Sequence, residues 1–110
     1  MSQVCTIDTI RTLAFGSISG TFAKVGSTTT NATRLVCFTN NTDGDMFFSY
    51  DGINNMIFVV AGGFKLFDIC ANRDDKNGVY LLSSSMQWYV KQSTAPSKGS
   101  VYIEVLYGMP

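Results

Sequence analysis

Short apolar runs separated by turn residues dominate the chain between Arg34 and Cys70. Each run is rich in β-branched and aromatic residues, which suit a pleated, half-buried surface, and each is too short for an ordinary helix. The spacers are rich in Gly, Asn and Asp, which favour turns. Strands of this length at this spacing predict an antiparallel sandwich or barrel. The four runs are Leu35–Phe38, Met46–Tyr50, Met56–Val60 and Phe64–Cys70.

Two further strands are predicted towards the end of the chain. Segments Met86–Gln92 and Ser100–Tyr107 alternate between apolar and polar positions, as half-buried strands do. Trp88 and Val90 are expected to face the core, beside Ile103, if these two strands pair as a hairpin across the short loop between them.

The 110 residues predict one domain, long enough to bury a core without metal or disulfide. We expect an all-β fold, a two-sheet antiparallel β-sandwich of jelly-roll-like type with about seven or eight strands. The runs Leu35–Phe38 and Ile57–Val60 are apolar on both faces, which predicts central strands covered on both sides. Residues Met1–Ile10 carry no turn signal and form either an N-terminal arm or a first edge strand.

Charges are few and balanced. The chain has 8 basic and 8 acidic residues, and charged residues make up 15% of it, against about 25% in an average domain. Because phosphate binding needs a basic surplus on one face, nucleic acid is not expected as a partner. No apolar run approaches the roughly 20 residues of a membrane span, so no membrane contact is expected. The N-terminal segment lacks the basic and apolar regions of an export signal, which predicts assembly in a cytoplasm.

The three cysteines, Cys5, Cys37 and Cys70, are widely spaced. They form neither a complete disulfide set nor a Cys-x-x-Cys metal pair. Cys37 and Cys70 lie inside apolar runs, where a thiol behaves as a small hydrophobe. We therefore expect both to be reduced and largely buried.

No catalytic pattern is present, and we expect no enzyme. Histidine is absent, which removes the commonest general base and metal ligand. Asp74 and Asp75 could bind a cation, but the surrounding charged segment lacks the alternating oxygen ligands of a calcium loop and is better interpreted as a solvated loop. We therefore expect no catalytic residue, no metal and no cofactor.

Aromatic side chains alternate with the predicted core positions. They belong either to a second covered face or to a protein interface, where Tyr and Phe are enriched. They could also stack on sugars, but Trp88 and Tyr89 are adjacent on a strand and cannot form one platform. The N-terminal segment offers further apolar anchors for a partner's sheet edge. The candidate interface residues are Val4, Ile7, Ile10, Phe47, Phe67, Tyr89 and Tyr102.

Several turn and strand motifs resemble those of small virion structural proteins of short-tailed bacteriophages. They are Asn40–Thr42, Ser49–Gly52, Ala61–Gly63, Asp68–Arg73, Trp88–Lys91 and Gly99–Tyr107. This class includes capsid decoration proteins, also called cement or staple proteins, which are jelly-roll-type sandwiches that bridge capsomers on the outside of the shell.

The resemblance implies a location in the virion after assembly in the host-cell cytoplasm, with the major capsid protein as partner. It supplies no catalytic residue. A homodimer is compatible with this function, because a two-fold contact uses one patch twice. The alternatives are a tail or neck component, which would bind tail or neck proteins, and thirdly a carbohydrate-binding receptor module.

Overall fold

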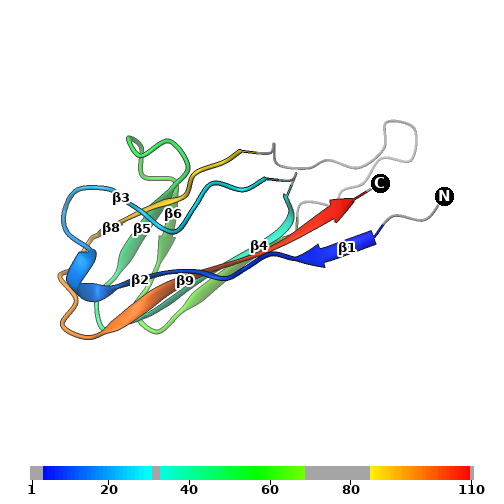
Figure 1. The fold of residues 1–110 in the computed structure, drawn as a ribbon. Coiled ribbons are helices and arrows are strands. Elements are labelled where there is room, and N and C mark those ends of the chain that lie inside the picture. Colours follow the sequence, from blue (N-terminus) through cyan, green and yellow to red (C-terminus); the bar gives the residue numbers. More distant parts are fainter. Residues whose placement is uncertain (1–3, 31–32, 69–84, 110) are drawn as a thin grey trace.

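The computed structural model describes residues 4–30, 33–68 and 85–109, which form two packed β-sheets (Figure 1). A three-residue 3-10 helix, η1 (Phe15–Ser17), follows β2. Sheet A contains β1 (Val4–Ile7), β2 (Arg11–Ala14), β4 (Thr33–Thr42), β7 (Phe64–Asp68) and β9 (Gly99–Met109). Sheet B contains β3 (Ala23–Lys24), β5 (Met46–Ser49), β6 (Ile57–Val59) and β8 (Tyr89–Gln92).

The strand order is that of a jelly roll. Sheet A has the order β1-β9-β4-β7, with β2 also paired to β9, and sheet B has the order β3-β8-β5-β6. Every pairing is antiparallel. From β2 onwards the described strands alternate between the sheets except at the β5–β6 hairpin, so each sheet receives four of them, in the order of an eight-stranded jelly roll. The predicted two-sheet antiparallel sandwich is confirmed, with nine described strands because β1 extends the same edge of β9 as β2.

The N-terminal segment forms a strand in this structure. Val4–Ile7 pair with the end of β9. After the strand, Asp8 accepts a hydrogen bond from the Arg11 guanidinium at 3.0 Å. The buried Arg11 also donates to the Ser27 carbonyl at 2.8 Å, which links the start of β2 to the segment after β3. Of the two sequence interpretations, arm and first strand, the structure has the strand.

The core contains the side chains predicted to face inward. Trp88, Val90, Ile103 and Val105 are all buried. The Phe38 ring packs edge-on against Trp88, with centroids 4.9 Å apart, and the Phe48 and Phe38 centroids are 5.1 Å apart. The remaining members of the core are Ile18, Val25, Val36, Met46, Val59 and Val101.

The predicted hairpin between the last two strands is wrong. β8 belongs to sheet B and β9 to sheet A, so residues 93–98 cross between the sheets. This crossing packs on the β4–β5 connection, where Gly44 approaches Thr94 so closely that an added Cβ would lie 2.3 Å from its carbonyl oxygen. The Ser97 N–H also donates to Asp43 at 2.6 Å. The β4–β5 and β8–β9 connections therefore lie side by side and pack on each other. β8 pairs with β5 and β9 pairs with β4, the two strands that the β4–β5 connection joins.

The two apolar runs were expected to be central strands covered on both sides. Only the first run is central, and neither is covered on both sides. Leu35–Phe38 lie in β4, which is central in sheet A, but the outward-facing Leu35 and Cys37 are only half-buried. Ile57–Val59 form β6, an edge strand. The apolar residues on the second side of each run therefore face outward, at the surface.

Cys37 is a half-buried free thiol, not the largely buried one that was expected. The physical reason is that its side chain points away from the core, next to Thr39. The predictions for Cys70, Asp74 and Asp75 fall on residues outside those that the structure describes.

Asn40 connects the two sheets. Its side chain is fully buried and donates to the carbonyls of Gly44 at 2.7 Å and Val59 at 3.0 Å. Its amide oxygen accepts from the Thr42 hydroxyl at 2.6 Å. Its backbone bonds both glycines of the β6–β7 turn. Asn40, a residue type common in turns, thus satisfies polar groups in the β4–β5 connection, in β6 and in the β6–β7 turn.

Asp51 orders the turn between β5 and β6. Its carboxylate accepts hydrogen bonds from the Ser49 hydroxyl at 2.6 Å and from the N–H groups of Ile53 at 2.8 Å and Asn54 at 3.0 Å. These bonds favour the charged form, and the Ser49 bond is the largest cause of a pKa of Asp51 well below its usual range.

This lowered pKa predicts a change in stability at acid pH. Because the folded-state pKa of Asp51 lies below the unfolded value of about 3.9, the carboxylate stabilises the fold at neutral pH. That contribution is lost as the pH falls below about 4 and on through the folded-state pKa. The difference in unfolding free energy between wild type and Asp51→Asn, measured by urea titration, should therefore shrink as the pH falls below about 4. A difference that stays constant into strong acid would contradict this assignment.

Candidate protein-binding surface

The β6–β7 side of the sandwich is where both sheets end. In the described residues, β7 pairs only with β4 and β6 pairs only with β5. The two strands belong to different sheets and are joined by a tight turn in which Gly62 has a φ of 74°. All five residues of β7 are exposed. One flank of each strand therefore has no paired neighbour among the described residues, which is the arrangement that other chains can extend.

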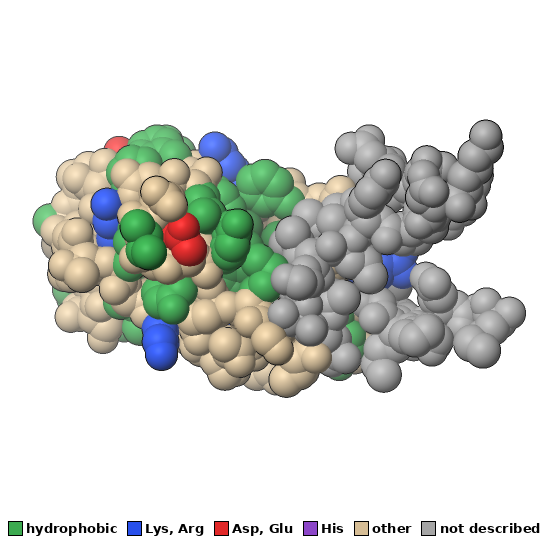
Figure 2. All heavy atoms as spheres, turned by 90° about the horizontal axis from the view of Figure 1, so that it is seen from above, with side chains coloured by type: hydrophobic (Ala, Val, Ile, Leu, Met, Phe, Trp, Pro, Cys, Tyr) green, Lys and Arg blue, Asp and Glu red, His purple; other side chains and the backbone are tan. Residues whose placement is uncertain are grey.

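Large apolar side chains are exposed along this side. Phe64 is 68% exposed and Leu66 is 55% exposed. Figure 2 shows hydrophobic side chains gathered next to one another on the described part of one face, interrupted by few charged ones. Several large apolar side chains exposed on adjoining edge strands are typical of an interaction site. We define the β6–β7 surface as Met56, Phe58, Val60, Phe64, Leu66 and Phe67.

The β6–β7 surface continues onto the outer face of sheet A. The strand register places Leu66 beside Cys37 and Cys37 beside Glu104. In the same register, Phe64 lies beside Thr39, and Thr39 lies beside the half-buried Tyr102. These three residues form a second row across the strands. The outer face of sheet A therefore presents apolar side chains around an exposed carboxylate.

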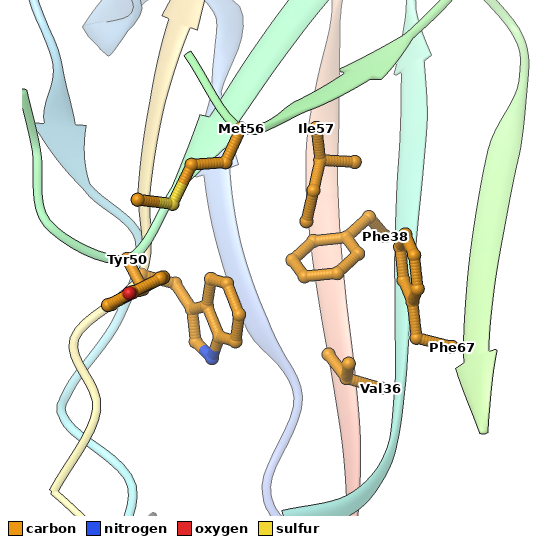
Figure 3. A pocket seen from close by; sticks show the side chains of 7 residues that line it. Val36, Phe38, Tyr50, Met56, Ile57 and Phe67 are labelled. Carbon is orange, nitrogen blue, oxygen red and sulfur yellow. The ribbon is translucent and has the colours of Figure 1, made fainter. Parts of the chain in front are cut away.

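An apolar cavity of about 200 Å³ lies between the two sheets on the same side. Figure 3 shows its labelled side chains converging from both sheets and from the β5–β6 connection. Tyr50, Met56 and Phe67 are partly exposed, so the cavity reaches the surface. The lining residues are Val36, Phe38, Tyr50, Met56, Ile57, Phe67 and Trp88.

Trp88 contributes its aromatic ring to this lining. The side chain is 3% exposed, and its indole Nε1 is buried with no hydrogen-bond acceptor among the described residues. The surface of the cavity is formed by apolar atoms, so the indole N–H is not accessible from the cavity.

The predicted interface residues are spread over several faces of the sandwich, and of those outside the β6–β7 surface Phe47 and Tyr102 adjoin it. Phe67 lies in the β6–β7 surface, but Phe47 and Tyr89 lie half-buried on the outer face of sheet B. Tyr102 lies on the outer face of sheet A. The Phe47 ring packs against Phe58 with centroids 5.2 Å apart.

The N-terminal candidates lie elsewhere. Ile7 and Ile10 are exposed at and after β1, which lies at the edge of sheet A opposite β7. The backbone of Val4 pairs with Met109, and its side chain is outside the described part. Sequence reasoning missed Phe64, Leu66 and Val60, because alternation alone does not reveal which strand is at an edge.

Within residues 4–30, 33–68 and 85–109, no three potential metal ligands lie together. The same residues include no helix long and apolar enough to cross a membrane.

Comparison with known proteins gives weak structural likenesses. No family model and no curated protein matches the chain. Among solved structures, the chain is similar to the SPP1 Dit (gp 19.1) protein, described as a paradigm of the hub adsorption apparatus in phages infecting Gram-positive bacteria. The TM-score is 0.38 at 15% identity, over 99% of this chain and 47% of Dit, so the chain spans about half of Dit's length. It is also similar to the Anabaena sensory rhodopsin transducer, with a TM-score of 0.32 at 12% identity, over 76% of this chain and 89% of that one. Neither likeness assigns a family.

Proposed function

We propose that this chain is a structural protein of a bacteriophage virion, most specifically a decoration protein that binds the outer capsid shell and bridges neighbouring capsid subunits. The observation that carries the proposal is the β6–β7 surface, where apolar side chains are exposed along strands at the edges of both sheets. The resemblance of the turn and strand motifs to virion structural proteins, together with the jelly-roll strand order, supports the same function.

The β6–β7 surface suits attachment by buried apolar area. Its members include three phenylalanines and a methionine, and both residue types are enriched at protein interfaces. The chain's balanced charge of 8 basic and 8 acidic residues provides no long-range attraction to a strongly charged partner. In the proposed function, each copy adds buried contact between capsid subunits and so opposes their separation by the pressure of packaged DNA.

The test is cosedimentation with purified shells that lack this protein. The double variant Phe64→Ser/Leu66→Ser should bind shells at least tenfold more weakly than wild type, equivalent to about 1.4 kcal/mol or more. Its melting temperature should change little, because both side chains are already exposed to solvent. Phe15→Ser is the matched control, since Phe15 is also an exposed aromatic but lies beside β2, at the opposite edge of sheet A.

Each other outcome contradicts part of the proposal. If the double variant binds shells like wild type, the β6–β7 surface is not the attachment site. If wild type ignores shells but binds purified tails or necks, the chain is a tail or neck component. Retention of wild type on a glycan column, with no binding to any virion part, would favour the carbohydrate-binding module.

A further inference from the structure

The cavity beside Trp88 has the size and chemistry of a receptor for one apolar side chain. Its volume of about 200 Å³ exceeds the roughly 150 Å³ that accommodates a benzene-sized group. Every lining residue contributes apolar or aromatic surface, Tyr50 included. An apolar group that entered from the β6–β7 side would exchange much of its contact with water for contact with apolar side chains.

The neighbouring edge strand, β7, could hold the occupant in an extended conformation beside the cavity. β7 pairs with β4 so that Phe67 lies opposite Val36 and Lys65 lies opposite Phe38. Val36 and Phe38 line the cavity, so Lys65 and Phe67 share the face of β7 that is directed between the sheets. Lys65 is exposed and makes no salt bridge among the described residues.

We propose that β7 and the cavity form a docking site for an extended segment of a partner protein. The segment adds to the outer edge of β7 as a new strand. One of its apolar side chains enters the cavity beside Phe67. An acidic residue two positions away faces Lys65, because strand residues alternate with a period of two. The inference rests on the proposed function only for the identity of the partner as a virion protein.

The experiment uses Trp88 as its own reporter, because it is the chain's single tryptophan. Blocked tripeptides Glu-Ser-Leu, Lys-Ser-Leu and Glu-Ser-Gly are titrated into the 15N-labelled protein while the indole N–H resonance is followed. Glu-Ser-Leu should shift that resonance saturably, and Glu-Ser-Gly, which lacks the apolar side chain, should not. Lys-Ser-Leu should bind about threefold more weakly than Glu-Ser-Leu, as expected for an exposed ion pair.

Two variants test the parts of the site separately. Lys65→Glu should reverse the preference between Glu-Ser-Leu and Lys-Ser-Leu without changing the fold, because Lys65 is exposed. Ile57→Phe should fill the cavity and abolish the saturable shift, whereas Ile53→Phe, in the exposed turn before β6, should leave it intact. A protein that shows no saturable shift with Glu-Ser-Leu in the millimolar range, or a preference that Lys65→Glu does not alter, would overturn the inference.

Failure of this inference differs from failure of the proposed function. Peptide binding without any binding to shells, tails or necks supports the docking site and contradicts the virion assignment. Binding to shells without peptide binding contradicts the docking site and leaves the decoration function in place.

Discussion

Replacement of Trp88 by alanine is expected to lower the free energy of unfolding by about 3–5 kcal/mol, the usual range for a buried large aromatic side chain. Trp88 is 3% exposed and packs edge-on against Phe38, so its removal would enlarge the cavity that already lies beside it. Urea denaturation followed by circular dichroism measures the change. This prediction concerns packing and does not depend on any partner.

Two further variants check the Trp88 prediction. Lys24→Ala, on the neighbouring strand β3 but with an exposed side chain, should change the unfolding free energy by no more than about 0.5 kcal/mol. Trp88→Phe retains an aromatic ring and removes the unpaired N–H, so it should cost much less than Trp88→Ala. Equal denaturation midpoints for wild type and Trp88→Ala would contradict the inward position of Trp88.

Asn40→Ala is expected to destabilise the fold by about 3–4 kcal/mol, because it removes four hydrogen bonds from a buried site. The Val59 carbonyl would lose the Asn40 donor and the Thr42 N–H its acceptor. The Thr42 hydroxyl and the Gly44 carbonyl would each lose their bond to Asn40 and keep the bond to each other. These groups belong to both sheets and to the β4–β5 connection, so the loss should lower the stability of the whole domain.

The adjacent Asn41 provides the matched control for Asn40. Asn41 is exposed, and Asn41→Ala should change the unfolding free energy by about 0.5 kcal/mol or less. Asn40→Asp keeps the acceptor but loses the amide donor and buries a charge, so it should be at least as damaging as Asn40→Ala at neutral pH. If Asn40→Ala and Asn41→Ala unfold at the same urea concentration, the bonds of Asn40 contribute no net stability.

The fold class could be predicted from the sequence because alternation is a local property. The inward positions of Trp88, Val90 and Ile103 follow from period-two patterning in two short segments, and the structure buries all three. The pairing of those segments could not be predicted in the same way. A short loop between two strands suggests a hairpin, and only the packing of residues 93–98 against the β4–β5 connection sends the chain into the other sheet.

The candidate surface was less accessible to sequence reasoning. Phe64 and Leu66 are apolar, as the residues of a buried strand are. They are nevertheless exposed, because β7 is at the edge of sheet A. Strand order is set by distant parts of the chain, so no local pattern reports it. Asn40 was likewise interpreted as a turn residue, since its partners at Gly44, Val59 and the β6–β7 turn meet it only in the folded domain.

The position of β9 has a consequence for how this protein is made. β9 lies between β4 on one side and β1 and β2 on the other, yet it is the last of the nine described strands to leave the ribosome. Until residues 99–109 emerge, sheet A lacks its middle strand, and the apolar faces of β2 and β4 have no common neighbour. Translation proceeds at about 5–20 residues per second, so the nascent chain spends seconds with these strands unpaired. Folding should therefore begin after synthesis of the C-terminal strand, and a chain stalled before Gly99 should remain protease-sensitive on the ribosome.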